Sequence, residues 1–141
     1  MIRQNDYILR EIEKISIMLQ GLLGKMIRRK EEGVISNEDE FNGWINTLPE
    51  KEMIDLDEIL ASDKKKLQVL LTETKGFNET NLEMLADLLT NIPLPENHPV
   101  KQEYLFKALE IYHLADEKYK TFSFQRNTRM EELRSLLEVK E

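Results

Sequence analysis

A glutamate and a histidine spaced three residues apart can bind a metal ion, and the sequence contains one such pair, Glu110 and His113. On a helix this spacing places both side chains on one face, as in bundles that bind two iron ions. Those sites also need a second Glu-x-x-His pair and two further glutamates. The only other histidine, His98, has no acidic residue three positions before it. A metal-dependent enzyme centred on Glu110 and His113 is therefore a minor hypothesis.

Patterns typical of other enzyme classes are missing from the sequence. Cysteine is absent, which excludes a thiolate nucleophile and any zinc or iron–sulfur site built on thiolates. No Gly-x-Ser-x-Gly, glycine-rich phosphate loop or His-Glu-x-x-His motif occurs. We therefore expect a protein that is not an enzyme and that carries no cofactor or metal.

The charge of the chain is acidic overall and unevenly distributed. The net charge is −7, which argues against a nucleic acid as partner, because phosphate binding needs a basic surface. Residues 1–30 hold 7 basic and 3 acidic side chains, whereas residues 31–60 hold 1 basic and 10 acidic side chains. The basic first segment either complements the acidic second segment within the chain or docks on an acidic partner.

The element with the strongest helical pattern is residues 6–30, with Asp6 as its expected N-cap. Its apolar residues follow spacings of four and three over nearly three heptads, which predicts an amphipathic docking helix. These residues are the first candidates for contact with a partner: Ile8, Ile12, Ile15, Leu19, Leu22 and Met26. Trp44 and Tyr112 are two further candidates, because aromatic side chains are enriched at binding hot spots. The alternative for both is packing in the core, since Trp44 shares a helical face with apolar residues and Tyr112 belongs to an aromatic group at a helix junction.

The remaining sequence predicts further helices and no strand. No window shows the alternation of apolar and polar residues that a half-buried strand requires. The fold class is all-α, with six or seven helices in antiparallel hairpins, either tetratricopeptide-like or an irregular helical bundle. Residues 1–33 form the docking helix and residues 34–141 the hairpin domain, together as one folding unit. Residues 91–99 contain three prolines and are expected to be an extended, exposed loop.

Two stretches resemble known families. Asp6-Tyr7-Ile8-Leu9-Arg10 with Ile12-Glu13, and the stretch from Leu105 to Leu137, resemble uncharacterised bacterial all-helical proteins grouped as a domain of unknown function. This resemblance implies a bacterial source and no activity. Ala108, Tyr112 and Ala115 are similar to the second helix of a tetratricopeptide repeat, although no 34-residue period is present.

We therefore expect a helical protein–protein interaction module that binds a protein partner or a second copy of itself through its first helix. The apolar face of that helix must be covered by the rest of the same chain, by a second copy or by another partner, because burying each large side chain is worth about 1.5–3 kcal/mol. An alternative is a peripheral membrane protein held by the basic end of the same helix, at Lys25, Arg28, Arg29 and Lys30. No secretory signal or membrane-spanning run is visible, so a cytoplasmic location is expected.

Overall fold

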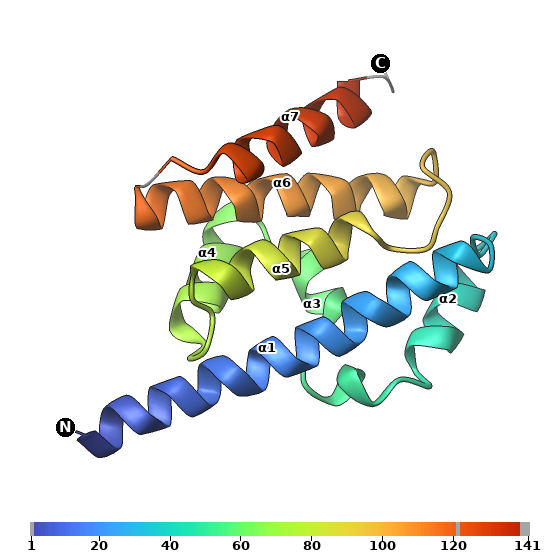
Figure 1. Ribbon diagram of the computed structural model, residues 1–141. Helices are drawn as coiled ribbons and strands as arrows, with labels where there is room; N and C mark the ends of the chain where they lie inside the picture. The colour runs from blue at the N-terminus through green and yellow to red at the C-terminus, as the bar shows by residue number, and fades with distance from the viewer. Residues whose placement is uncertain (1, 121, 139–141) are drawn as a thin grey trace.

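The computed structural model describes residues 2–120 and 122–138, which form seven α-helices, one 3₁₀ helix and no strand (Figure 1). This confirms the predicted all-α class. The elements are α1 (Ile2–Glu31), α2 (Glu38–Ile45), η1 (Pro49–Glu52), α3 (Leu56–Ala61), α4 (Lys64–Glu73), α5 (Glu79–Thr90), α6 (Pro99–Tyr119) and α7 (Phe124–Glu138).

Helix α1 is longer than the predicted range of 6–30. It already includes Ile2, so Asp6 lies inside the helix and the prediction that it caps the N-terminus is wrong. Apolar spacing defines only the part of a helix that packs against something, and the first turns of α1 extend beyond the other helices (Figure 1). The helix ends as predicted before Gly33, whose φ of 118° is readily available only to glycine.

Asparagine and aspartate side chains begin most of the shorter helices. Asn37, Asp55, Asp63 and Asn78 each accept a hydrogen bond from the backbone N–H three residues later. The N-cap of α6 is His98, whose Nδ1 accepts from the Val100 N–H at 3.1 Å. For the last helix the sequence predicts Thr121 or Ser123 as the N-cap. The Ser123 hydroxyl accepts from the Arg126 N–H at the start of α7, and Thr121 lies outside the described residues.

Four long helices form the body of the molecule. Helices α5 and α6 are antiparallel and form the most extensive helix pair; α7 packs on α6, and α1 packs on α5 (Figure 1). The shorter elements α2, η1, α3 and α4 connect α1 to α5. The core between these elements is apolar, and its members with no exposed surface are Leu19, Met26, Leu85, Ala86, Leu88, Leu89, Ile92, Leu105, Ala108, Ile111 and Ala115.

The segment between α5 and α6 corrects a second prediction. Residues 91–99 were expected to be exposed, but Ile92 is fully buried and Leu94 is 2% exposed. The Lys101 ammonium is also buried and donates to the backbone carbonyls of Thr90 and Ile92, at 3.0 and 2.6 Å. Proline prevents helix formation here, but the apolar side chains between the prolines still enter the core.

Candidate interaction surface

The inner face of α1 belongs to the core of this chain. Four of the six predicted partner-binding residues on α1 have at most 9% of their surface exposed: Ile15, Leu19, Leu22 and Met26. They pack with the buried leucines of α5 in one continuous cluster. The apolar face that had to be covered is therefore covered by the same chain, and these four side chains have no surface left for a partner.

The other predicted partner-binding residues divide into exposed and buried ones. Ile8 is 40% exposed and Ile12 is half-buried. Trp44 is half-buried against Phe41, with ring centroids 6.3 Å apart. Tyr112 is 1% exposed, and its hydroxyl donates to Asp87 at 2.5 Å. Burial and this hydrogen bond raise the pKa of Tyr112, so the side chain is a neutral core residue.

The loop before α5 fixes the position of α1. Gly76 has a φ of 102°, and a Cβ at this residue would lie 2.6 Å from the Glu11 carbonyl oxygen. The buried Asn81 amide donates to the carbonyls of Ile12, at 3.0 Å, and Gly76, at 2.6 Å. Backbone therefore meets backbone at this crossing, which leaves α1 little freedom to rotate.

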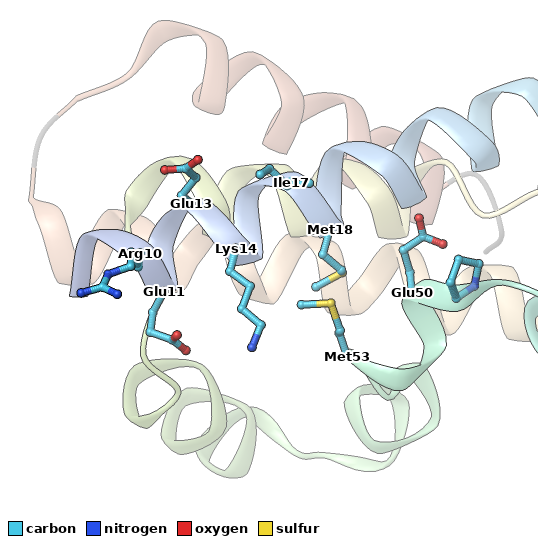
Figure 2. Close-up of a pocket in the computed structure, with 9 residues that line it drawn as sticks. Arg10, Glu11, Glu13, Lys14, Ile17, Met18, Glu50 and Met53 are labelled. Carbon is cyan, nitrogen blue, oxygen red and sulfur yellow. The ribbon is translucent and has the colours of Figure 1, made fainter. Parts of the chain in front are cut away.

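A groove lies between α1 and η1. The Lys25 ammonium contacts both carboxylate oxygens of Glu50 at 2.9 Å, and this carboxylate lies against Gly21. The groove beside this pair has a volume of about 690 Å³. Figure 2 shows Met18 of α1 and Met53 facing each other across it, while Lys14 extends into it. The groove thus combines flexible apolar walls with charged edges.

The outer face of α1 points away from the core and is also rich in apolar residues. We define it as the exposed residues spaced by four or three positions on that side: Leu9, Glu13, Ile17, Gln20, Gly24 and Ile27. Leu9 and Ile17 are each 62% exposed, and Ile27 is 41% exposed. Glu13 and Ile17 lie where this face borders the groove, and they line it together with Lys14 (Figure 2).

Ile17 and Ile27 were not among the residues predicted to bind a partner. The strongest apolar periodicity of this helix runs through Ile15, Leu19, Leu22 and Met26, and it leaves Ile17 and Ile27 on the other side of the helix. The sequence does contain a signal for this face, because Leu9, Ile17, Gly24 and Ile27 are non-polar and only Glu13 and Gln20 are polar. The outer face therefore forms a second, weaker seam on the same helix.

The basic end of α1 is largely occupied by contacts within the chain. Lys25 pairs with Glu50, Arg29 donates to the Gly33 carbonyl at 2.7 Å, and Lys30 donates to Asn91 at 3.2 Å. Arg28 is exposed. Complementation between the basic first segment and the acidic second segment is thus seen in the Lys25–Glu50 pair.

Glu110 and His113 lie on α6 in different surroundings. Glu110 pairs with Lys107 at 3.2 Å, and His113 lies 3.5 Å from Arg134. Burial and the Arg134 charge lower the pKa of His113. Among residues 2–120 and 122–138 there is no group of three or more His, Asp or Glu side chains that could hold a metal ion.

No family model, no curated protein and no solved structure matches this chain. In the described part of the chain, no helix is long and apolar enough to cross a bilayer.

Proposed function

We propose that the protein is a helical interaction module that associates with a second copy of itself through the outer face of α1. The observation that carries this proposal is the exposure of Leu9 and Ile17, both 62% exposed on a helix whose opposite face is already buried. Isolated exposed apolar residues are common, but three on one face of a long projecting helix form a seam. Such a seam is what a helix–helix contact uses.

An antiparallel arrangement of two α1 helices suits this seam best. Leu9 and Ile27 are separated by eighteen positions, about 27 Å along the helix, with Ile17 near the middle. A two-fold axis close to Ile17 places Leu9 of one copy opposite Ile27 of the other, twice in the interface. The same axis brings Asp6 near Arg28, and both of these side chains are exposed. Opposite charges therefore meet at each end of the seam.

The expected dimer is weak, because a single helix pair buries less surface than a standard interface of about 1,600 Å². We expect dissociation in about the micromolar range. Light scattering across a concentration series should show the molar mass rising from monomer to dimer. The double variant Leu9→Glu/Ile17→Glu should remain monomeric at all concentrations. Val69→Glu is the matched control, because Val69 is a 46% exposed apolar residue on α4, outside the outer face.

Charge reversal tests the antiparallel geometry separately. Asp6→Arg and Arg28→Asp should each weaken the dimer several-fold, since each places like charges together. The double variant should recover most of the affinity, because the attraction is restored with its sign exchanged. Failure of the double variant to recover would reject the antiparallel pairing. A wild-type chain that stays monomeric up to millimolar concentration would reject self-association altogether.

Three further expectations belong to this proposal. They are the bacterial source implied by the first resemblance, the tetratricopeptide-like character of α6, and the cytoplasmic location. They rest on the sequence, namely on the residues of both resemblances and on the absence of cysteine.

A further inference from the structure

A second cavity, of about 800 Å³, opens among α2, η1, α3, α4 and α6. This volume is within the range of small-molecule sites. Phe41 and Tyr104 form part of its lining, with ring centroids 6.2 Å apart in an edge-to-face arrangement. Ile45, Ile54 and Leu70 add apolar surface to the wall. An alkyl chain could therefore lie against this part of the cavity.

The rim of the cavity is acidic. Its charged lining residues are the four carboxylates of Glu52, Asp55, Asp57 and Glu58 and one ammonium group, that of Lys51. Lys51 donates to the Asn46 side chain. None of the four carboxylates pairs with a lysine or arginine within the described residues. The rim therefore carries an excess of negative charge that the surrounding chain does not neutralise.

Tyr104 provides an independent sign of a ligand. The side chain is only 2% exposed and lines the cavity, yet residues 2–120 and 122–138 offer its hydroxyl no hydrogen bond. The hydroxyl oxygen is not fully enclosed, so a hydrogen-bonding ligand can reach it from the cavity. Burial, together with the negative charges of Asp57, Glu38, Glu103 and Asp55, raises the pKa of Tyr104. The neutral hydroxyl oxygen can accept a hydrogen bond from an ammonium group.

We propose that this cavity binds a linear polyamine, with ammonium groups at the carboxylate rim and the Tyr104 hydroxyl and alkyl segments against Phe41 and Tyr104. A compact metal ion fits less well, because the described carboxylates do not converge into a group of three or more that could hold one. An extended cation can instead contact several separate carboxylates at once. This binding site is distinct from the outer face of α1 and is independent of self-association.

Calorimetric titration of the full chain with spermidine in 150 mM NaCl tests the proposal, because this salt screens diffuse attraction between exposed charges. Saturable binding of one spermidine per chain is expected. Asp57→Asn/Glu58→Gln should weaken the affinity by about tenfold or more, since charged hydrogen bonds are lost. The matched control is Asp39→Asn/Glu40→Gln, which removes two charges from the same position of the short helix α2 but outside the cavity lining. It should change the affinity less than about twofold.

Tyr104→Phe separates binding from folding. It keeps the ring that packs on Phe41 and removes only the hydroxyl, so the melting temperature should be unchanged while spermidine binds about threefold more weakly. Three outcomes would overturn the proposal. The first is an equal loss of spermidine affinity in the two double variants. The second is that Mg²⁺ competes for the site as effectively as spermidine does. The third is that trilysine binds more tightly than spermidine, which would indicate a basic peptide as the ligand.

Discussion

Gly76 occupies a position at which any side chain would collide with α1. Its φ is 102°, and an added Cβ would lie 2.6 Å from the Glu11 carbonyl oxygen and 2.8 Å from Ile15. We expect Gly76→Ala to lower the free energy of unfolding by about 2 kcal/mol or more, because it combines a strained backbone with displacement of α1. Urea unfolding followed by circular dichroism measures this change.

Gly24→Ala is the matched control for Gly76→Ala. Gly24 lies inside α1 with a φ in the helical region and no atom within 4 Å of an added Cβ. Alanine should therefore stabilise the protein by about 0.5–1 kcal/mol, as expected for an unhindered helix interior. Equal effects of the two substitutions would contradict the close approach of Gly76 to α1.

Lys101 makes stability depend on pH through a single buried group. Burial lowers its pKa from 10.5 to about 8, although Glu96 acts in the opposite direction. At pH values between these two, the unfolded chain holds a proton that the native chain has released. The cost in free energy of burying the charged Lys101 amine is therefore fully present below pH 8. It decreases as the pH rises toward 10.5, so the free energy of unfolding increases over this range.

The test compares the wild-type chain with Lys101→Met between pH 7 and pH 9.5. The stability of the wild-type chain relative to the variant should rise over this range, since only the wild type carries the titrating amine. Ionisation of tyrosines in the unfolded chain is common to both proteins and cancels in this comparison. Parallel pH profiles for the two proteins would show that the native pKa of Lys101 is not lowered.

At the scale of elements, the buried Arg126 links α7 to α5 and α6 through ion pairs. The Arg126 side chain has no exposed surface and contacts Asp116 of α6 at 2.6 Å and Glu79 and Glu83 of α5 at 2.7 and 2.5 Å. Arg126→Met leaves three carboxylates close together without a cation. We expect a loss of about 2 kcal/mol, less than for a fully buried pair, because these carboxylates are partly exposed.

Arg126→Lys should lose most of the same stability, because an ammonium group cannot reproduce the planar, multiple contacts of a guanidinium. Arg134→Met, on the same helix but exposed, is the control and should change the stability by less than about 0.5 kcal/mol. Chemical denaturation of the three variants distinguishes these cases. A lysine variant as stable as the wild type would show that the charge at residue 126 matters and the geometry of the guanidinium does not.

The elements also show how far the sequence could predict this protein. Local capping chemistry, which depends on a few neighbouring residues, predicts helix starts within Ser36-Asn37-Glu38-Asp39, at Ser62 or Asp63, and at Asn78 or Thr80. The structure caps α2, α4 and α5 with Asn37, Asp63 and Asn78. The burial of residues 92–94 did not follow, since proline rules describe the backbone and not where a loop packs. The acidic cavity was equally hidden, because Tyr104 and Asp57 are brought together only by the packing of α3 against α6.

For α1 the sequence predicted an apolar face in need of a cover but not what covers it. Both a core helix and a docking helix require the same spacing of Ile15, Leu19 and Leu22. The structure covers this face with α5, so the surface available for association is the outer face instead. Periodicity alone does not distinguish these cases, because the cover lies about 65 residues away along the chain.

At the scale of the whole molecule, we expect α1 to unfold together with the rest of the chain as one cooperative unit. It contributes Leu19, Leu22 and Met26 to the core, each with at most 2% of its surface exposed. Burial of three such side chains is worth roughly 5–9 kcal/mol, comparable to the total stability of about 5–15 kcal/mol of a typical domain. A chain that starts at Val34 should therefore lose cooperative thermal unfolding and expose the leucines of α5.

Circular dichroism and light scattering of this shortened chain test whether the remaining helices fold without α1. We expect a non-cooperative melt and aggregation, whereas Leu9→Glu/Ile17→Glu should melt like the wild type while remaining monomeric. A folded, monomeric chain starting at Val34 would instead make α1 a separable arm. The shortened chain tests whether the inner face of α1 stabilises the fold, and Leu9→Glu/Ile17→Glu tests whether the outer face mediates association. Because the first changes the melt and the second changes only the molar mass, the two roles of this helix can be tested independently.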